Sequence, residues 1–216
     1  MGIQTTRLIS AILRTALVLL ALKVVLVTFI SYRDYMPPNF DSDFLAGRQS
    51  YFWQGYHWAF YPHIVAGPVT LLLGLVLLSE SFRRRWPLWH RRLGRVQAGL
   101  VLLVVVPSGF VMGFRAAFGP IAAVGLIGLA IATAATVTMG WRAAVQRRFD
   151  VHRKWMLRCY TLLFSAVVIR FLGGIGQVAG VQADWYYIQA TWTSWIIPLI
   201  GVELLLLRRR HRIGVR

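Results

Sequence analysis

Six long apolar segments alternate with shorter polar ones along the chain. They cover about residues 12–31, 58–79, 96–114, 119–140, 156–175 and 190–207. An α-helix of about 20 mostly apolar residues is long enough to cross the hydrocarbon core of a bilayer. The pattern therefore predicts an all-α protein, a polytopic bundle of six transmembrane helices in a single domain over residues 1–216. Residues 32–57 are the one long connection, an outer loop rich in aromatic side chains.

The composition supports a membrane protein. Hydrophobic residues make up 57% of the chain and charged residues only 14%, against about 25% charged residues in soluble proteins. A soluble protein of this composition would expose large apolar patches. We therefore expect the apolar side chains to face the lipid bilayer.

The formal net charge of +17 reflects basic residues that cluster in the second and fourth connections and in the C-terminal tail. The other connections hold few basic residues and most of the aspartates, including Asp41, Asp43 and Asp184. This asymmetry places both termini in the cytoplasm by the positive-inside rule, with the chain in the cell inner (plasma) membrane. It also argues against nucleic acid as a partner, because that would require basic residues spread over a folded face. The three clusters are Arg83, Arg84, Arg85, Arg91, Arg92 and Arg95, then Arg142, Arg147, Arg148, Arg153, Lys154 and Arg158, and finally Arg208, Arg209, Arg210, Arg212 and Arg216.

A short motif occurs twice. His90-Arg91 and His152-Arg153 each follow a basic connection and open an ascending helix, with Arg95 or Arg158 one turn or more further on. Helices two and three and helices four and five therefore look like two similar hairpins that form a four-helix core, with helices one and six outside it. Small residues throughout 119–140 predict close helix packing there.

Beyond the terminal three residues of the apolar segments, four Lys, Arg, His or Glu residues remain at depths where charge is costly and is usually paired or functional. Lys23 lies near the middle of the first segment and Glu203 near the end of the last. We predict a Lys23–Glu203 ion pair, with Arg158 as the competing partner of Glu203. A Lys23 that reaches the interface alone is the remaining alternative.

Arg170 and His63 are the other two. Arg170 lies near the outer end of its helix, where it could reach lipid headgroups, Asp184 or a substrate. His63 lies near the outer surface of the membrane. Three roles remain open for it: a neutral hydrogen-bonded side chain, a proton relay, or a ligand-binding residue.

The paired motifs are the strongest candidate site. His90 and His152 should lie at one depth on helices that are diagonal in the bundle. Two histidines in that position could coordinate one b-type haem from both faces, so the candidate metal ligands are His90 and His152. The arginines at positions 91, 95, 153 and 158 could then bind propionates, a lipid phosphate or a quinone. Interfacial histidines in a positive-inside loop, and an anion site without haem, remain alternatives.

The segments "HIVAGPVTLLLG", "LWHRRLGRVQ", "PSGFVMGF", "DVHRKWMLRCYTLLFSAVVIRF" and "WTSWIIPLIGVEL" resemble a bacterial family of predicted integral membrane proteins of unknown function, domain-of-unknown-function family 2306. The resemblance covers about His63 to Glu203. Val96-Gln97 departs from it, where an aromatic residue is expected. The positions that carry it are His63, His90, Arg91, Gly94, Arg95, His152, Arg153, Trp155, Met156, Arg158, Arg170, Trp195 and Glu203.

The resemblance implies a fold but no activity. The layout is similar to that of small membrane-bound b-type cytochromes and ferric reductase-like bundles, although no second histidine pair is present for another haem. Our leading hypothesis is a membrane redox protein with one b-type haem. The rival is a non-redox transporter or a lipid- or anion-binding accessory protein, in which His63, Arg170 and Glu203 couple protons or gate. Neither P-loop nor hydrolase motifs occur, and the sequence indicates no reaction.

Overall fold

A computed structural model describes residues 2–42, 44–181 and 183–214. Within these ranges six helices are long and apolar enough to span a membrane, namely Ala11–Tyr35, Gln49–Leu78, Pro87–Gly113, Gly119–Val145, Phe149–Val178 and Asp184–Arg208. Each contains most or all of one predicted segment, so the six-helix, all-α prediction is confirmed. Asp43 and Arg216, which the topology prediction uses, lie outside the described residues, as do the side chains of Arg209, Arg210 and Arg212.

The chain divides into two compact units, residues 1–50 and 51–216. The first unit contains helix α1 (Gly2–Tyr35) and the loop that follows it. Lys23 is exposed at the middle of the apolar part of α1. In the loop, the Arg48 guanidinium donates hydrogen bonds to the backbone carbonyls of Phe44 and Ala46, which closes a tight turn.

A short helix, α2 (Gln49–Tyr51), runs across the boundary, and its last residue is the first of the second unit. The spans of the second unit are linked by connections of a few residues, as expected for neighbouring antiparallel helices. The remaining elements, in order, are η1 (Phe52–Tyr56), α3 (His57–Leu78), α4 (Glu80–Arg85), α5 (Pro87–Leu100), η2 (Val101–Val105), α6 (Val106–Gly113), α7 (Gly119–Val145), α8 (Phe149–Leu163), α9 (Ser165–Val178) and α10 (Asp184–Gly214).

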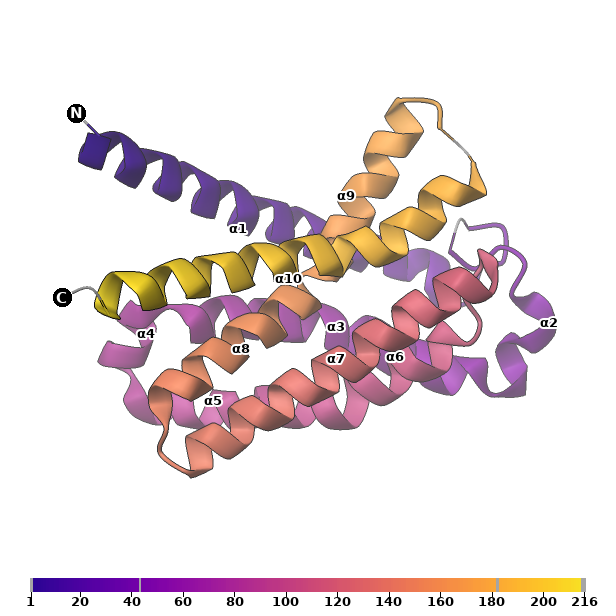
Figure 1. Cartoon of the computed structure of the whole chain (residues 1–216). Helices are drawn as coiled ribbons and strands as arrows, with labels where there is room; N and C mark the ends of the chain where they lie inside the picture. Colours follow the sequence, from indigo (N-terminus) through magenta and orange to yellow (C-terminus); the bar gives the residue numbers. More distant parts are fainter. Residues whose placement is uncertain (1, 43, 182, 215–216) are drawn as a thin grey trace. The chain divides into compact units, whose positions relative to one another are not determined.

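Four spans of this unit form a closed ring of neighbours. Helix α3 packs against α5 and α8, and α7 also packs against α5 and α8 (Figure 1). Helices α5 and α8 are therefore diagonal, as predicted for the two ascending helices. Helix α10 packs outside this core, against α7, α8 and α9.

Glycines allow the close approach of these helices, as the small-residue pattern predicts. A Cβ atom on Gly140 of α7 would lie 2.7 Å from the Met156 sulfur of α8, so a larger residue would require Met156 to shift. Gly125 and Gly128 of α7 similarly face Trp192 and Trp195 of α10.

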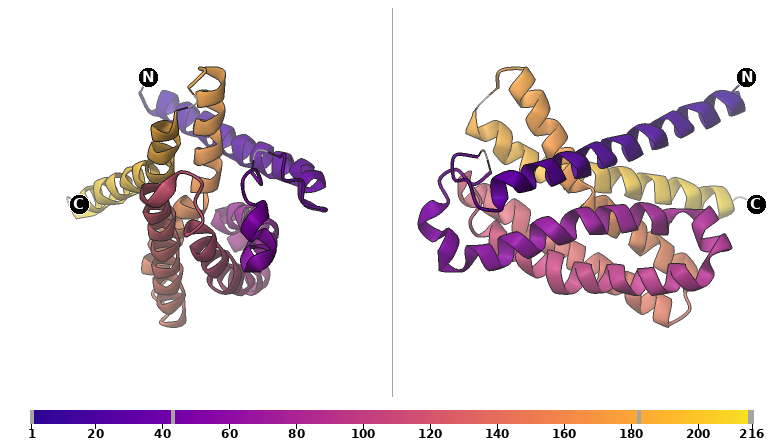
Figure 2. Two further views of the ribbon diagram at one scale, coloured as in Figure 1. Left: turned by 90° about the vertical axis from the view of Figure 1, so that its right-hand side faces the viewer. Right: turned by 180° about the vertical axis from the view of Figure 1, so that it is seen from behind.

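Both ascending helices are broken at nearly the same distance from their histidine. The π-helical segment η2 begins at Val101, eleven residues after His90, and the break between α8 and α9 falls at Phe164, twelve residues after His152. Pro107 follows η2 and cannot donate a backbone hydrogen bond, which explains the first break. Beyond the second break, α9 leans away from the core (Figure 2). The similarity of the two hairpins thus extends beyond their His-Arg motifs.

Candidate functional site

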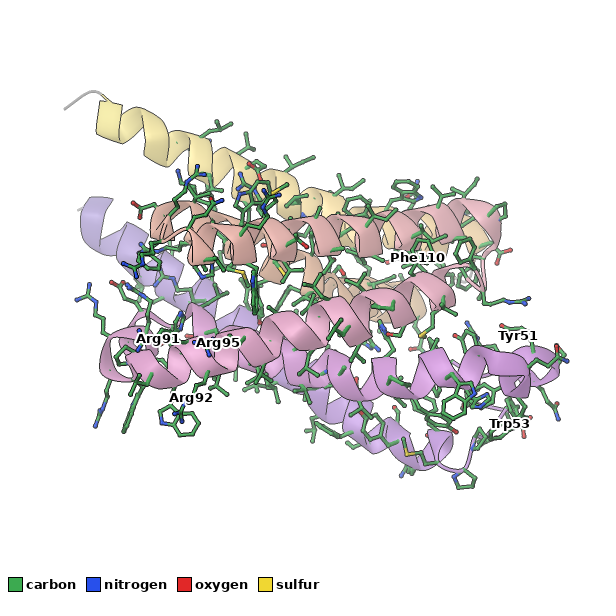
Figure 3. All side chains as sticks on the ribbon, turned by 90° about the horizontal axis from the view of Figure 1, so that it is seen from below. Tyr51, Trp53, Arg91, Arg92, Arg95 and Phe110 are labelled. Atoms are coloured by element: carbon green, nitrogen blue, oxygen red, sulfur yellow. The ribbon has the colours of Figure 1, made fainter. Side chains whose placement is uncertain are left out.

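The α3–α5 and α7–α8 connections lie at the same end of the four-helix core, which we call the basic end. Arg91, Arg92 and Arg95 lie at this end, whereas Tyr51 and Trp53 lie at the opposite end (Figure 3). The two connections are also neighbours, since Glu80 of α4 is close enough to Arg153 of α8 to interact electrostatically. The arginine clusters of these two connections are thus gathered at one end of the core.

His152 is anchored by one ring nitrogen. Its Nδ1 lies 2.8 Å from the backbone carbonyl oxygen of Gly140 on α7. A carbonyl can only accept a hydrogen bond, so Nδ1 carries the proton and Nε2 of the neutral ring keeps its lone pair. Nε2 can therefore bind a metal or accept a proton.

His90 reaches the same region from the diagonal helix α5. It lies close enough to His152 and to Arg83 for electrostatic interaction. Its Nδ1 atom is buried and finds no hydrogen-bond partner among the residues that the structure describes. Such a buried, unpaired nitrogen is uncommon in native proteins and calls for a bound group or water. The two histidines that the sequence predicts to be paired are thus within electrostatic range of each other.

Arg158 is already engaged by another side chain. Its Nε and Nη2 atoms donate to the two carboxylate oxygens of Glu203 on α10, at 2.5 and 2.7 Å. Its guanidinium also lies over the Trp155 ring, 4.6 Å from the centroid. Of the two partners predicted for Glu203, Arg158 forms the ion pair in the structure. The pair with Lys23, which belongs to the other unit, stays a prediction. Arg91, Arg95 and Arg153 are exposed, and of the four predicted anion-binding arginines they are the ones open to an anion.

The sequence prediction missed Gln97 as part of the interior of the core. It lies seven residues beyond His90, and its amide nitrogen donates to the Thr70 carbonyl of α3 at 3.0 Å. Only 3% of the residue is exposed, yet within the described chain its Oε1 atom accepts no hydrogen bond. The equivalent position on α8 is Cys159, which is buried and lies beside Thr136. A polar residue in an apolar segment was the available signal for Gln97.

His63 on α3 and Arg170 on α9 lie further from the basic end. The Nδ1 atom of His63 is 2.9 Å from the hydroxyl of Ser108 on α6. Arg170 donates to the Ala166 carbonyl of its own helix at 3.0 Å and is within electrostatic range of His63. The set proposed for proton coupling is therefore divided, because Glu203 is paired with Arg158 nearer the basic end.

Comparisons with known proteins give a family but no relative of known activity. A family model described as a predicted membrane protein (DUF2306) matches residues 60–206. No curated protein and no solved structure matches the chain.

Proposed function

We propose that this chain, which belongs to the family of predicted membrane proteins of unknown function described above, is a membrane redox protein. The proposal rests on the chain's own residues. In this proposal one b-type haem is held between α5 and α8 by His90 and His152. The supporting observation is the approach of these two imidazoles at the basic end, from helices that are diagonal in the core.

The donor set is suited to haem iron. Neutral imidazole is a common axial ligand, and metal-binding histidines usually donate their other N–H to a carbonyl or carboxylate. His152 has this arrangement through Gly140. His90 has no such partner for its buried Nδ1 among the residues that the structure describes, and in this proposal the His90 ring turns when the site is filled.

The surrounding residues have separate roles in this proposal. The exposed Arg91, Arg95 and Arg153 bind the propionates or a quinone headgroup. The Arg158–Glu203 pair instead fixes α8 to α10 and so positions the helix that carries His152. Bound haem would supply one-electron chemistry, and the apolar side chains of the core would exclude water from it.

Haem titration of the purified apoprotein tests this proposal. The wild-type chain should bind one equivalent with the spectrum of a six-coordinate, low-spin haem. His90→Ala and His152→Ala should each lose that spectrum, whereas the His57→Ala control, at the opposite end, should keep it. Folded wild-type protein that binds no haem would overturn the proposal.

We further propose that the basic end faces the cytoplasm, with both termini on that side. The gathered arginines support this orientation, because basic loops are retained in the cytoplasm. A reporter fused after Arg216 should be active only in the cytoplasm, and one inserted into the 32–57 loop only outside it. The reverse pattern would overturn the orientation.

A further inference from the structure

The break in the third span lies beside a polar pair. Pro107 supplies no backbone N–H, and Ser108 follows it at the beginning of α6. The Ser108 hydroxyl donates to the backbone carbonyl of Val104 at 2.5 Å, with the Val105 carbonyl at 3.2 Å. His63 of α3 contacts this same hydroxyl from across the helix interface. Ser108 therefore serves two partners at once.

The contacts of Ser108 assign the proton of the His63 ring. A serine hydroxyl has one hydrogen, and we assign it to the Val104 carbonyl, the shorter of the two backbone contacts. With this assignment the Ser108 oxygen accepts from His63, so the proton of the neutral imidazole is on Nδ1, and the Val105 backbone is a further hydrogen-bond partner of the ring. The Nε2 atom is left with a lone pair that can accept a hydrogen bond but cannot donate one.

The position of His63 determines which donors can reach that lone pair. His63 lies six residues into α3, about 9 Å from the helix start at 1.5 Å per residue, and inside the Gln49–Leu78 span. The ring is half-buried, and Gly67, one turn further along the helix, is in open space, because a Cβ there would meet nothing within 4 Å. Gly109 lets α6 lie against the ring edge, since a Cβ there would be 3.2 Å from Cε1 of His63. Arg170 is within electrostatic range of the ring. A ligand that reaches His63 at this depth must be soluble in lipid.

We propose that His63 forms a second site, separate from the His90–His152 pair, which binds a lipid-soluble quinol. The Nε2 atom of His63 accepts a hydrogen bond from a ring hydroxyl of the quinol. The oxidised quinone has only carbonyl oxygens and cannot make this bond. The site therefore prefers the reduced form. The proposal concerns binding alone, involves no electron transfer and does not depend on haem.

A binding experiment on the purified full chain in lipid nanodiscs tests this preference. A short-chain ubiquinol, kept reduced, and the matching ubiquinone are titrated separately while tryptophan fluorescence is followed. We expect the quinol to bind about tenfold more tightly, as one hydrogen bond of about 1.4 kcal/mol would give. His63→Leu should weaken quinol binding by about the same factor and leave quinone binding unchanged.

Two further variants make the result specific. His57→Leu is the matched control. The His57 Nδ1 atom also has a hydrogen-bond partner, the Phe52 carbonyl at 3.0 Å, but this residue lies at the end of the core. The quinol affinity of His57→Leu should stay that of the wild type. Ser108→Ala frees the proton of His63 to occupy either nitrogen, so the preference for quinol should shrink even if His63→Leu does not fold. Equal affinity of the wild-type protein for both forms, a preference for quinone, or a preference unchanged in Ser108→Ala would overturn the proposal.

Discussion

The Arg158–Glu203 ion pair should be a measurable contribution to stability. Two charge-assisted hydrogen bonds in a bidentate arrangement join α8 to α10. Fully exposed pairs contribute about 0.2–1 kcal/mol, whereas breaking a buried pair costs about 3–5 kcal/mol. The two side chains are 20% and 41% exposed, between these limits. We therefore expect a coupling free energy of about 2 kcal/mol, with allowance for screening of the more exposed carboxylate.

A double-mutant cycle measures this value. The free energy of unfolding would be determined in mixed detergent and SDS for the wild type, Arg158→Gln, Glu203→Gln and the double variant. The same cycle on Arg84 and Glu80, an exposed pair on α4, is the control and should give a much smaller coupling. A cycle of Lys23→Gln with Glu203→Gln tests the alternative partner. Coupling of Arg158 and Glu203 below about 0.5 kcal/mol would refute our reasoning.

Two further predictions concern packing and pH. Gly140→Ala should lower the free energy of unfolding by about 1–3 kcal/mol, because its Cβ would collide with Met156. Gly67 is in open space, so Gly67→Ala should be neutral or stabilising by up to about 1 kcal/mol. Thermal unfolding of both variants checks this, and equal losses of stability would contradict it. The hydrogen-bonded Arg84 guanidinium lowers the pKa of the Glu80 carboxyl from 4.5. The stabilisation that ionised Glu80 gives is therefore fully present above pH 4.5, and it is lost as the pH falls through the lower pKa of the folded state. Glu80→Gln should therefore show a shallower loss of stability as the pH falls below 4.5, and parallel curves for the two proteins would contradict this assignment.

The membrane architecture could be predicted because it depends on properties that are local in the sequence. Hydropathy located all six spans, and the repeated His-Arg motif placed His90 and His152 at one end of the core. Hydropathy did not locate the helix ends, because charged turns continue the helices past the apolar region. Helix α8, for example, begins at Phe149 rather than at the predicted position 156.

The side-chain partners could not be predicted in the same way. Whether Glu203 meets Lys23 or Arg158 depends on how each helix is rotated about its axis. The sequence does not specify this rotation, because apolar residues lie on all faces of these helices. The His63–Ser108 contact requires the π-helical segment before Pro107, and this segment shifts the register of the residues that follow. Gln97 had a visible signal as a polar residue in an apolar run, but its Thr70 partner is set by packing between α3 and α5.

The central claim is that His90 and His152 hold a redox-active group between two diagonal helices. The most direct test is the dithionite-reduced minus oxidised optical spectrum of the protein as purified from membranes. We predict the α-band of a b-type haem at one equivalent per chain, absent in both His90→Ala and His152→Ala. A colourless, folded protein, or a band that survives both substitutions, would contradict the claim.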